Sequence, residues 1–254
     1  MKNRQDEILY YLYRFRFLNR NQIQTLLTHK YYNRIIIWLN ELTQTQYIKR
    51  YYNPKTVTIP AIYSLGTKAR KYLKNNPEFK YVKEKLLDRI WREYTLSEQF
   101  KKHCIFIADI YIELIKLTQK SSSKLNFRTK TDLYEIKDLI KPLPDAYFTI
   151  EEKDGKVKRY FLDIFDELPA RMILRRRIRK YFDYYEKNIW QEKVAGDFPN
   201  IILIAPDQRF KNYLKKQILI MLENEPELNF YLSTWIEIKK QGFTSKTLEK
   251  IYLA

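Results

Sequence analysis

The sequence predicts an α/β protein, α+β overall, that is built from two parts. Residues 1–76 contain short amphipathic helices followed by two β-prone stretches. Residues 96–254 contain a helix, three strands, and then helices alternating with strands. Between these parts, Asn75, Asn76 and Pro77 interrupt the helical pattern and mark a boundary. With 254 residues, 45% of them apolar, the chain is long enough to form two hydrophobic cores.

The first predicted helix opens at Asp6 and is expected to end near Leu18. Ile8, Leu12 and Phe15 recur every three or four residues, which places them on one side of a helix. This side is expected to face the core.

Two further helices follow. Residues 19–21, Asn19 to Asn21, supply polar capping material for a short helix over NQIQTLLTH, and a third helix is predicted over residues 31–44. The buried stripe of the third helix is formed by Ile35, Leu39 and Leu42. Three short helices at this spacing match a helix-turn-helix core.

Two β-prone stretches, residues 47–53 and 58–66, come next and predict a hairpin. A helix over residues 67–74, capped by Thr67, closes the unit. The segments NELTQTQYIKRYY and LGTKARKYL resemble the third helix, wing strands and following helix of winged-helix DNA-binding domains. We therefore expect residues 1–76 to form such a domain.

The positive charge is concentrated in this domain. The chain has a net charge of +18, and residues 1–76 hold 14 Lys and Arg against three acids, or +11. A basic domain is the footprint of a polyanion binder, although a solvated basic surface or a protein-binding winged helix would fit as well. The third helix would read bases in the major groove, and the wing would contact phosphates. The candidate readers are Lys30, Tyr32, Asn33 and Arg34, and the wing cations are Lys49, Arg50 and Lys55.

The second part begins after a predicted connecting helix over residues 77–95. A long helix over residues 96–120 opens the domain. Strands are predicted over residues 124–133, 144–150, 159–165, 200–206 and 229–238, and helices over residues 171–190 and 210–224. The apolar run at 200–206 indicates a strand buried on both faces. This order predicts a mixed sheet covered by helices, as in the restriction-endonuclease-like nuclease fold.

The hairpin PDAYFTIEEKDGKVKRYFLDIF could carry a catalytic centre. A three-residue loop with Gly155 in its left-handed position pairs Glu152 with Lys156 and places Asp145 opposite Asp163. Two carboxylates so placed could hold Mg²⁺ beside a phosphodiester. A two-residue loop would shift the pairing by one, and the glycine position permits either loop.

Pro144, Asp145 and Asp163 resemble the PD-(D/E)XK nuclease motif. The chain departs from this motif at Phe165, where a lysine usually orients or activates the attacking water. The two aspartates could instead be surface residues at strand ends.

A basic residue of the next helix could replace the missing lysine. Arg177 and Lys180 are the candidates, and an arginine would stabilise charge without acting as a base. Asp166 and Glu167 are further candidate metal ligands.

The same helix is crowded with cations and aromatic residues. Arg175 and Arg176 are candidate DNA contacts. The aromatic residues could stack on bases of an opened strand or form the core face of the helix. We favour the core for Phe182 and Tyr185, and both options stay open for Tyr181 and Tyr184.

The chain resembles the replication-relaxation family of plasmids and integrative elements through HCIFIADIYIEL, LPDAYF, RYFLDIFDE and LRRRIRKYFDYY. The resemblance implies a winged helix joined to a degenerate restriction-endonuclease-like domain. His103 and Asp109 match the family's helix that enters the second domain. Arg177 stands in the place of a family lysine and Tyr181 in that of a family tyrosine.

Several classes of protein are disfavoured. Cys104 has no cysteine partner and is expected to be a buried thiol, and two histidines with one cysteine do not make a structural zinc site. The four glycines lie too far apart for a phosphate-binding loop. The absence of an apolar run of membrane length and of a signal peptide leads us to expect a cytoplasmic protein.

The sequence therefore predicts a sequence-specific DNA-binding protein of a plasmid or mobile element. The resemblance adds a role in replication initiation, relaxation or mobilisation. Expected partners are double-stranded DNA, replication proteins and a second copy in a homodimer, and DNA binding would need no cofactor. The alternatives are a Mg²⁺-dependent endonuclease using Asp145 and Asp163, and a transcriptional repressor; we favour a protein without enzymatic activity.

Overall fold

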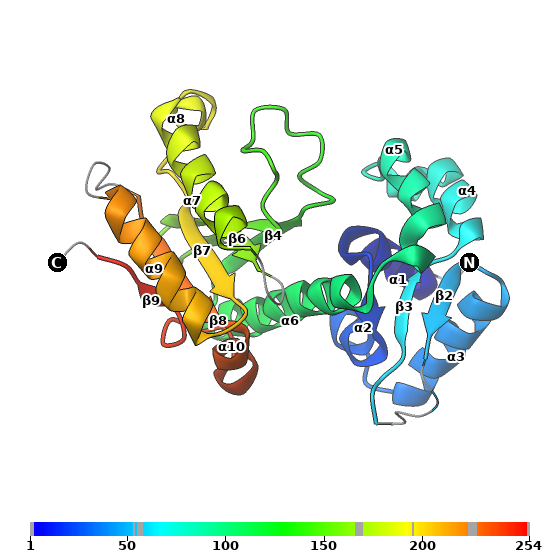
Figure 1. The fold of residues 1–254 in the computed structure, drawn as a ribbon. Coiled ribbons are helices and arrows are strands. Elements are labelled where there is room, and N and C mark those ends of the chain that lie inside the picture. Colours follow the sequence, from blue (N-terminus) through cyan, green and yellow to red (C-terminus); the bar gives the residue numbers. More distant parts are fainter. Residues whose placement is uncertain are drawn as a thin grey trace. The chain divides into compact units, whose positions relative to one another are not determined.

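The computed structural model describes residues 3–52, 54, 58–165, 170–194, 196–222 and 228–252. The chain divides into two compact units, residues 1–112 and residues 113–254, and helix α6, Glu98–Ser121, contributes to both (Figure 1). Helices and two separate sheets confirm the α/β class. The domain boundaries predicted at residues 76 and 95 stay a prediction. No helix in the described ranges combines the length and apolar character needed to cross a bilayer.

Unit 1 contains the predicted helices and a small antiparallel sheet of strand order β1-β3-β2, in which Ile48 lies opposite Leu65. The core side of α3 consists of the predicted stripe together with Trp38. The first elements are α1 (Asn3–Phe15), β1 (Leu18–Asn19), α2 (Arg20–Leu26), α3 (Tyr32–Gln44), β2 (Ile48–Tyr51), β3 (Ile62–Leu65) and α4 (Thr67–Asn75). Within the predicted capping segment, Asn19 is the residue that caps α2, in a reciprocal capping box with Gln22.

Helix α1 ends at Phe15, before the predicted Leu18. Arg16 has a φ of 69°, a left-handed conformation that an α-helix does not continue. Its guanidinium is held by Glu93, with 3.0 Å between Nε and Oε1. The chain is thereby released from the helix, and Leu18 begins strand β1, opposite Tyr63.

The entry into α4 depends on a glycine. The prediction that Thr67 caps this helix is wrong, because the N-cap is Gly66 and no side chain bonds to the helix start. The Gly66 amide donates to the Tyr47 carbonyl over 2.8 Å, and a Cβ at Gly66 would collide with the Gln46 carbonyl oxygen. Close backbone approach therefore sets the start of the helix.

The predicted single helix over residues 77–95 is three short helical segments instead. They are η1 (Pro77–Phe79), α5 (Glu84–Leu87) and η2 (Asp88–Thr95), of which η1 and η2 are 3₁₀ helices. The Lys83 amide donates to the Tyr13 hydroxyl over 2.8 Å. Because this amide bonds to a side chain of α1, it does not donate to the carbonyl four residues earlier, as it would in a continuous helix over residues 77–95.

Unit 2 is built on a six-stranded sheet of order β4-β5-β6-β7-β8-β9. Strands β6, β7 and β8 are parallel, and the remaining pairs are antiparallel. After α6 its elements are β4 (Lys124–Thr129), β5 (Ala146–Glu151), β6 (Val157–Ile164), α7 (Arg171–Glu186), α8 (Ile189–Lys193), β7 (Asn200–Ala205), α9 (Gln208–Leu222), β8 (Phe230–Thr234), α10 (Trp235–Gln241) and β9 (Glu249–Lys250).

Helices α7 and α9 pack together over this sheet (Figure 1). Their core contains Leu174 and Ile178 of α7, Leu214 of α9, and Ile201 and Leu203 of β7. The intervening residues of β7 are buried as well, which confirms a strand covered on both faces. Because β6, β7 and β8 are parallel, their carboxyl ends lie at the same end of the sheet.

The last predicted strand, over residues 229–238, is correct only as far as Thr234. Trp235 begins α10, because the Thr234 hydroxyl accepts from the Glu237 amide and the Glu237 carboxylate accepts from the Thr234 amide. This capping box is visible in the sequence as Thr-x-x-Glu. The two-residue strand β9 was not predicted; it pairs with β8 at Leu232 and Glu249.

Candidate functional site

One side of α3 is free of core contacts. Tyr32 is 41% exposed and Ile37 is 45% exposed, and Asn33 and Arg34 are also exposed. Lys30, just before the helix, is exposed as well. The four predicted base readers therefore lie at the accessible start of one helix, opposite its buried stripe.

Arg20 is a further cation beside this surface that sequence reasoning missed. Its guanidinium lies 4.4 Å from the centroid of the Tyr32 ring, a cation–π contact that fixes both side chains. The Nε of Arg20 is buried and has no hydrogen-bond partner among the described residues. Arg20 is the first residue of α2. It does not belong to the pattern of apolar residues from which the helix was predicted, so this pattern gives no reason to single it out.

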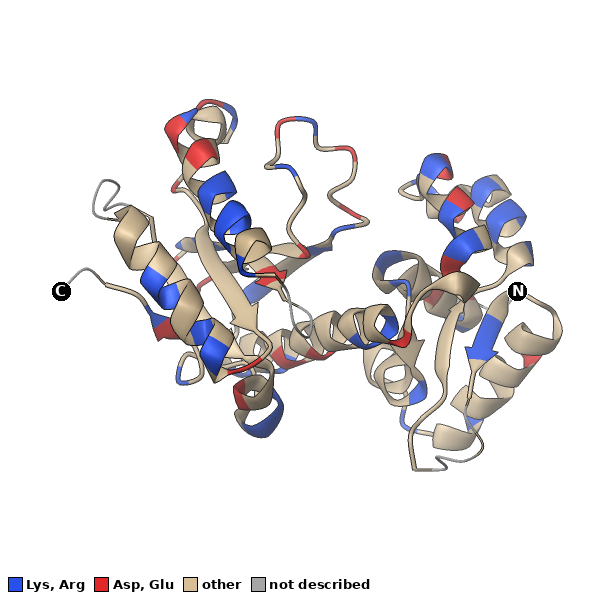
Figure 2. Ribbon diagram, viewed as in Figure 1, with Lys and Arg blue, Asp and Glu red and all other residues tan. Residues whose placement is uncertain are grey.

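The cations of β2 rest on aromatic rings. Lys49 Nζ lies 5.0 Å from the ring of Tyr94, and the Arg50 guanidinium lies 4.9 Å from the ring of Tyr52. Both cations are exposed, and Figure 2 shows the basic stretch of β2. Lys55, the third predicted wing cation, lies outside the described residues.

Helix α2 is tied to α6 by one buried amide. Gln22 Nε2 donates to Asp109 Oδ1 over 2.6 Å and to the Ile105 carbonyl over 2.8 Å, while its Oε1 accepts from the Asn19 amide. The helix that precedes the exposed α3 is thereby anchored at its amino end.

The hairpin of β5 and β6 has the predicted three-residue loop. The Glu152 amide donates to the Lys156 carbonyl over 2.9 Å, and Gly155 has a φ of 83°. The paired residues include Ala146 with Leu162, so the register carries Asp145 to the position opposite Asp163. The two aspartates therefore lie opposite each other where β5 begins and β6 ends.

Asp163 is buried, 6% exposed, and is engaged by α7. Arg177 donates to it from two nitrogens, with Nη2 lying 3.1 Å from Oδ1 and Nε bonded to Oδ2. The Tyr181 hydroxyl donates to Oδ2 over 2.8 Å, and Arg177 also donates to the Pro142 carbonyl. Both carboxylate oxygens are thus occupied by donors from one helix.

Burial and the neighbouring charges shift the pKa values of Arg177 and Tyr181 in this cluster. Burial by itself would lower the pKa of Arg177, but the Asp163 carboxylate raises it, and the net shift is upward. Burial, followed by the Asp163 charge, raises the pKa of Tyr181 well above its usual value. Arg177 therefore keeps its positive charge, and Tyr181 remains a neutral hydrogen-bond donor.

The donor set of these residues does not suit Mg²⁺. A guanidinium already neutralises Asp163, and Asp145 Oδ2 accepts from the Ile164 amide over 2.9 Å. Among the described residues, no three His, Cys, Asp or Glu side chains converge on a point where an ion could sit. Asp166 and Glu167, the further candidate ligands, lie outside that set.

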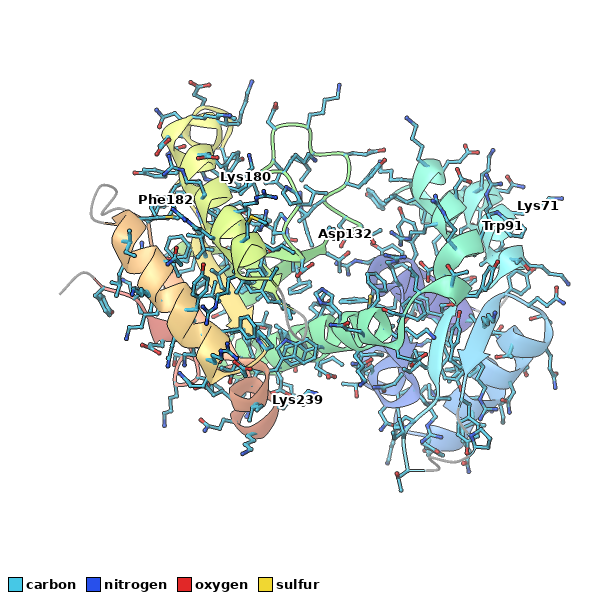
Figure 3. All side chains as sticks on the ribbon, viewed as in Figure 1. Lys71, Trp91, Asp132, Lys180, Phe182 and Lys239 are labelled. Carbon is cyan, nitrogen blue, oxygen red and sulfur yellow. The ribbon has the colours of Figure 1, made fainter. Side chains whose placement is uncertain are left out.

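Beside the cluster lies a cleft of about 380 Å³, which we name the α7 cleft. It is lined by four cations, one acid and five uncharged residues: Lys130, Arg176, Arg177, Lys180, Asp163, Pro142, Leu143, Ile164, Phe165 and Ile173. Figure 3 shows Lys180 on the exposed side of α7 and Phe182 on its core side. The structure therefore brings Asp163, Arg177, Lys180 and Arg176 together.

Arg175 is not part of this group. It lines a separate depression with Arg179 between α7 and α9. The two neighbouring arginines predicted to bind DNA together therefore face different surfaces of the helix.

The aromatic residues of α7 belong to the core. Tyr181 and Phe182 are buried, and the Tyr184 hydroxyl donates to the Asp138 carbonyl over 2.9 Å. Burial raises the pKa of Tyr184 to about 12. Tyr185 is partly buried against the same core. Stacking of these rings on bases is thus not available in this fold.

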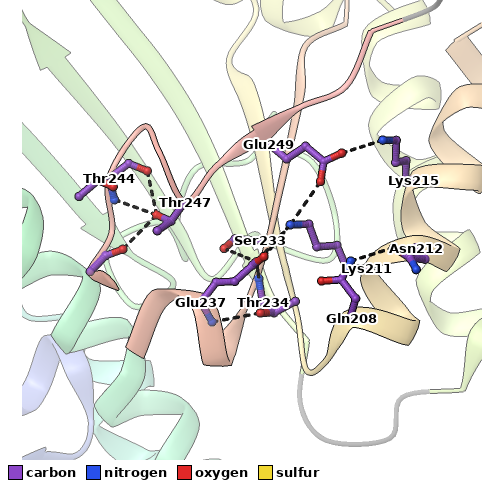
Figure 4. A network of polar contacts seen from close by, with 11 residues as sticks. Gln208, Lys211, Asn212, Lys215, Ser233, Thr234, Glu237, Thr244, Thr247 and Glu249 are labelled. Atoms are coloured by element: carbon purple, nitrogen blue, oxygen red, sulfur yellow. Dashed lines mark hydrogen bonds and ion pairs between the residues drawn. The ribbon is translucent and has the colours of Figure 1, made fainter. Parts of the chain in front are cut away.

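A second buried cation was missed in the sequence. Lys211 of α9 contacts Glu237 over 3.0 Å and Glu249 over 3.3 Å, as Figure 4 shows. For Glu237 burial would raise the pKa, but the bond from Lys211 and the Thr234 amide lower it; for Glu249 the bond from Lys215 leads the lowering of the pKa. These ion pairs, with the bond between Glu237 and Thr234, link α9 to α10, β8 and β9, and the opposite charges neutralise one another.

A family model described as replication-relaxation matches residues 9–201. A search of curated proteins found no match to the chain.

Proposed function

Because the chain belongs to the replication-relaxation family, which supports a role in replication or relaxation of a plasmid or mobile element, we propose that it is a sequence-specific DNA-binding protein. The target is double-stranded DNA of the element, such as its origin or an operator. The observation that carries the proposal is the exposed, cationic start of α3, together with the exposed cations of β2.

The order of unit 1 supports a winged helix. Three helices are followed by the β2–β3 hairpin, and β1 completes the small sheet. In such domains the third helix enters the major groove and the hairpin lies along the backbone. Arg34 and Asn33 have the donors and acceptors to pair with guanine and adenine edges. Lys49 and Arg50 contact phosphates, which fix the register but do not specify sequence.

The experiment is selection of bound fragments from the replicon's DNA, followed by binding measurements on an enriched fragment. Arg34→Ala is expected to weaken specific binding by about 1–3 kcal/mol and to relax the sequence preference. Lys49→Ala is expected to weaken all sequences alike and to reduce the salt slope by about 1. Arg4→Ala, which removes an exposed charge paired with Glu7 on α1, is the matched control.

An absence of any enriched fragment, or equal losses in Arg34→Ala and Arg4→Ala, contradicts the proposal. Binding to an operator without effect on copy number of the element favours a repressor instead.

The proposal gives unit 2 a role in binding rather than in cutting. Its hairpin resembles a nuclease centre, but Arg177 neutralises the acid that a catalytic metal would need. Supercoiled plasmid should therefore remain uncut in Mg²⁺ or Mn²⁺. Cutting that is lost in Asp163→Ala while unit 2 stays folded would instead establish an endonuclease. A homodimer and contacts with replication proteins are further parts of the proposal, and sedimentation of the free and DNA-bound chain tests the first.

A further inference from the structure

The α7 cleft joins an apolar bottom to a cationic rim. Ile164 and Phe165 are buried and form its bottom, with Leu143 beside them. Lys130, Arg176 and Lys180 are exposed and form its rim. A surface of this kind suits a ligand with one flat or apolar part and one anionic part.

The charge of the cleft is not balanced from within. Among its lining residues, Asp163 is neutralised by Arg177, so that three positive charges remain. Two of the three rim cations form long ion pairs with acids outside the lining: Lys130 Nζ lies 3.8 Å from Asp145 Oδ1, and Lys180 Nζ lies 3.8 Å from Asp183 Oδ2. Arg176 has no ion-pair partner among the described residues. The two ammonium groups and the guanidinium of the rim can therefore donate hydrogen bonds to an anion.

We propose that the α7 cleft binds a nucleotide, with its phosphate on Lys130, Arg176 and Lys180 and its base or sugar on Ile164, Phe165 and Leu143, without a metal ion. The Arg177–Asp163–Tyr181 cluster is the positioning element, because it holds α7 against the end of β6 and neutralises the one acid among the lining residues of the cleft. This inference deepens the proposed function, since it assigns the second unit a nucleic-acid contact of its own.

The size of the cleft separates unpaired nucleotides from duplex DNA. A volume of about 380 Å³ lies within the range of nucleotide-sized ligands. In a duplex the base is stacked and paired, so only the phosphate could reach the rim and the apolar bottom would stay empty. The ligand is therefore an unpaired nucleotide, either in an opened DNA strand or free in solution.

The test uses the full chain in EDTA and in Mg²⁺ with three probes: a fluorescent oligothymidylate, thymidine monophosphate and inorganic phosphate. The oligothymidylate is expected to bind equally in both buffers. One phosphate neutralised at the rim predicts a contribution of about −0.7 to the salt slope of single-strand binding. The Arg176→Ala/Lys180→Ala variant should lose at least about fivefold in affinity and most of the contribution of about −0.7 to the slope.

Arg179→Ala is the matched control, because it removes an exposed arginine of the same helix that lies outside the cleft. A 4-thiothymidine probe cross-linked by light should label Leu143, Phe165 or Ile173, which locates the site without any substitution. Competition by thymidine monophosphate at equal affinity identifies the free nucleotide as the ligand, and competition only by the oligomer identifies the strand.

Equal losses in the cleft variant and in Arg179→Ala overturn the proposal, as do cross-links confined to unit 1 or binding that requires Mg²⁺. The outcome is independent of duplex recognition, which Arg34→Ala tests. Loss of duplex binding in the cleft variant, with single-strand binding intact, also overturns the proposal.

Discussion

Arg177 shows how a single side chain changes the chemistry of a nuclease-like hairpin. It is 7% exposed and donates to both oxygens of Asp163. A buried ion pair contributes little compared with an apolar pair, but removing one partner leaves an uncompensated charge. Removal of Arg177 would therefore leave the buried charge of Asp163 without a compensating partner.

Arg177→Met is expected to destabilise unit 2 by about 3–5 kcal/mol. Hydrogen exchange of the β6 amides measures this locally, without assuming two-state unfolding of the whole chain. Arg176→Met, which removes the exposed neighbour, should change exchange by no more than about 0.5 kcal/mol. Adding Asp163→Asn to Arg177→Met should restore part of the loss, since the buried charge is gone. Equal exchange in Arg177→Met and Arg176→Met would show that Asp163 is solvated.

At the scale of elements, Gln22 joins the amino end of α2 to α6. Its side chain satisfies the capping box at one end and the Asp109 and Ile105 acceptors at the other. The α3 surface follows this anchored helix directly in the chain. Loss of the Gln22 hydrogen bonds should therefore destabilise α3 as well as α2.

Gln22→Ala is expected to destabilise unit 1 by about 1–3 kcal/mol, because the Asn19 amide and the Asp109 carboxylate lose a partner. Asn21→Ala, at the exposed neighbouring position, is the control and should stay close to wild type. Exchange of the α2 and α3 amides is the measurement. Similar protection in both variants would mean that water replaces the Gln22 amide.

At the scale of the whole molecule, the two units should respond to pH in opposite directions. Burial is the main cause of a raised pKa at Glu93 in unit 1, against the lowering effect of Arg16 and Arg89. In unit 2, Glu237 and Glu249 have lowered pKa values for the reasons given above.

The signs follow from proton uptake. Above the usual value of 4.5 the folded unit 1 holds a proton on Glu93 that the unfolded chain has released, so its stability falls as pH rises through the raised pKa. For Glu237 and Glu249 the stabilisation is present above 4.5 and is lost as pH falls through their lowered pKa values. Both groups of unit 2 are partly solvated, so the second effect is reduced by solvent screening.

Hydrogen exchange between about pH 4 and 7 can separate these contributions when wild type is compared with Glu93→Gln and Glu237→Gln. The pH slope of unit 1 should become more positive in Glu93→Gln, and that of unit 2 less positive in Glu237→Gln. An unchanged slope in either variant would contradict its assigned group.

The sequence alone determined the α/β class, the three helices before the β2–β3 hairpin and the buried strand β7, and it narrowed the register of the β5–β6 hairpin to two choices. These follow from local rules: apolar spacing, an Asn19 cap, and a glycine that adopts the left-handed position of a turn. The exposed side of α3 could also be read from its buried stripe. Arg177 could have been assigned to the core, since it lies between Leu174 and Tyr181 on the apolar side of α7.

Only the tertiary structure decided what the two aspartates contact and which side of α7 each arginine faces. Strand β1 exists because Arg16 leaves the helix toward Glu93, a residue far away in the chain. Asp163 became an ion-pair acceptor because α7 returns over the end of β6. These outcomes depend on contacts between segments distant in sequence, for which spacing and propensity carry no information, since the free energy of a buried charge is set by the neighbours that folding brings to it.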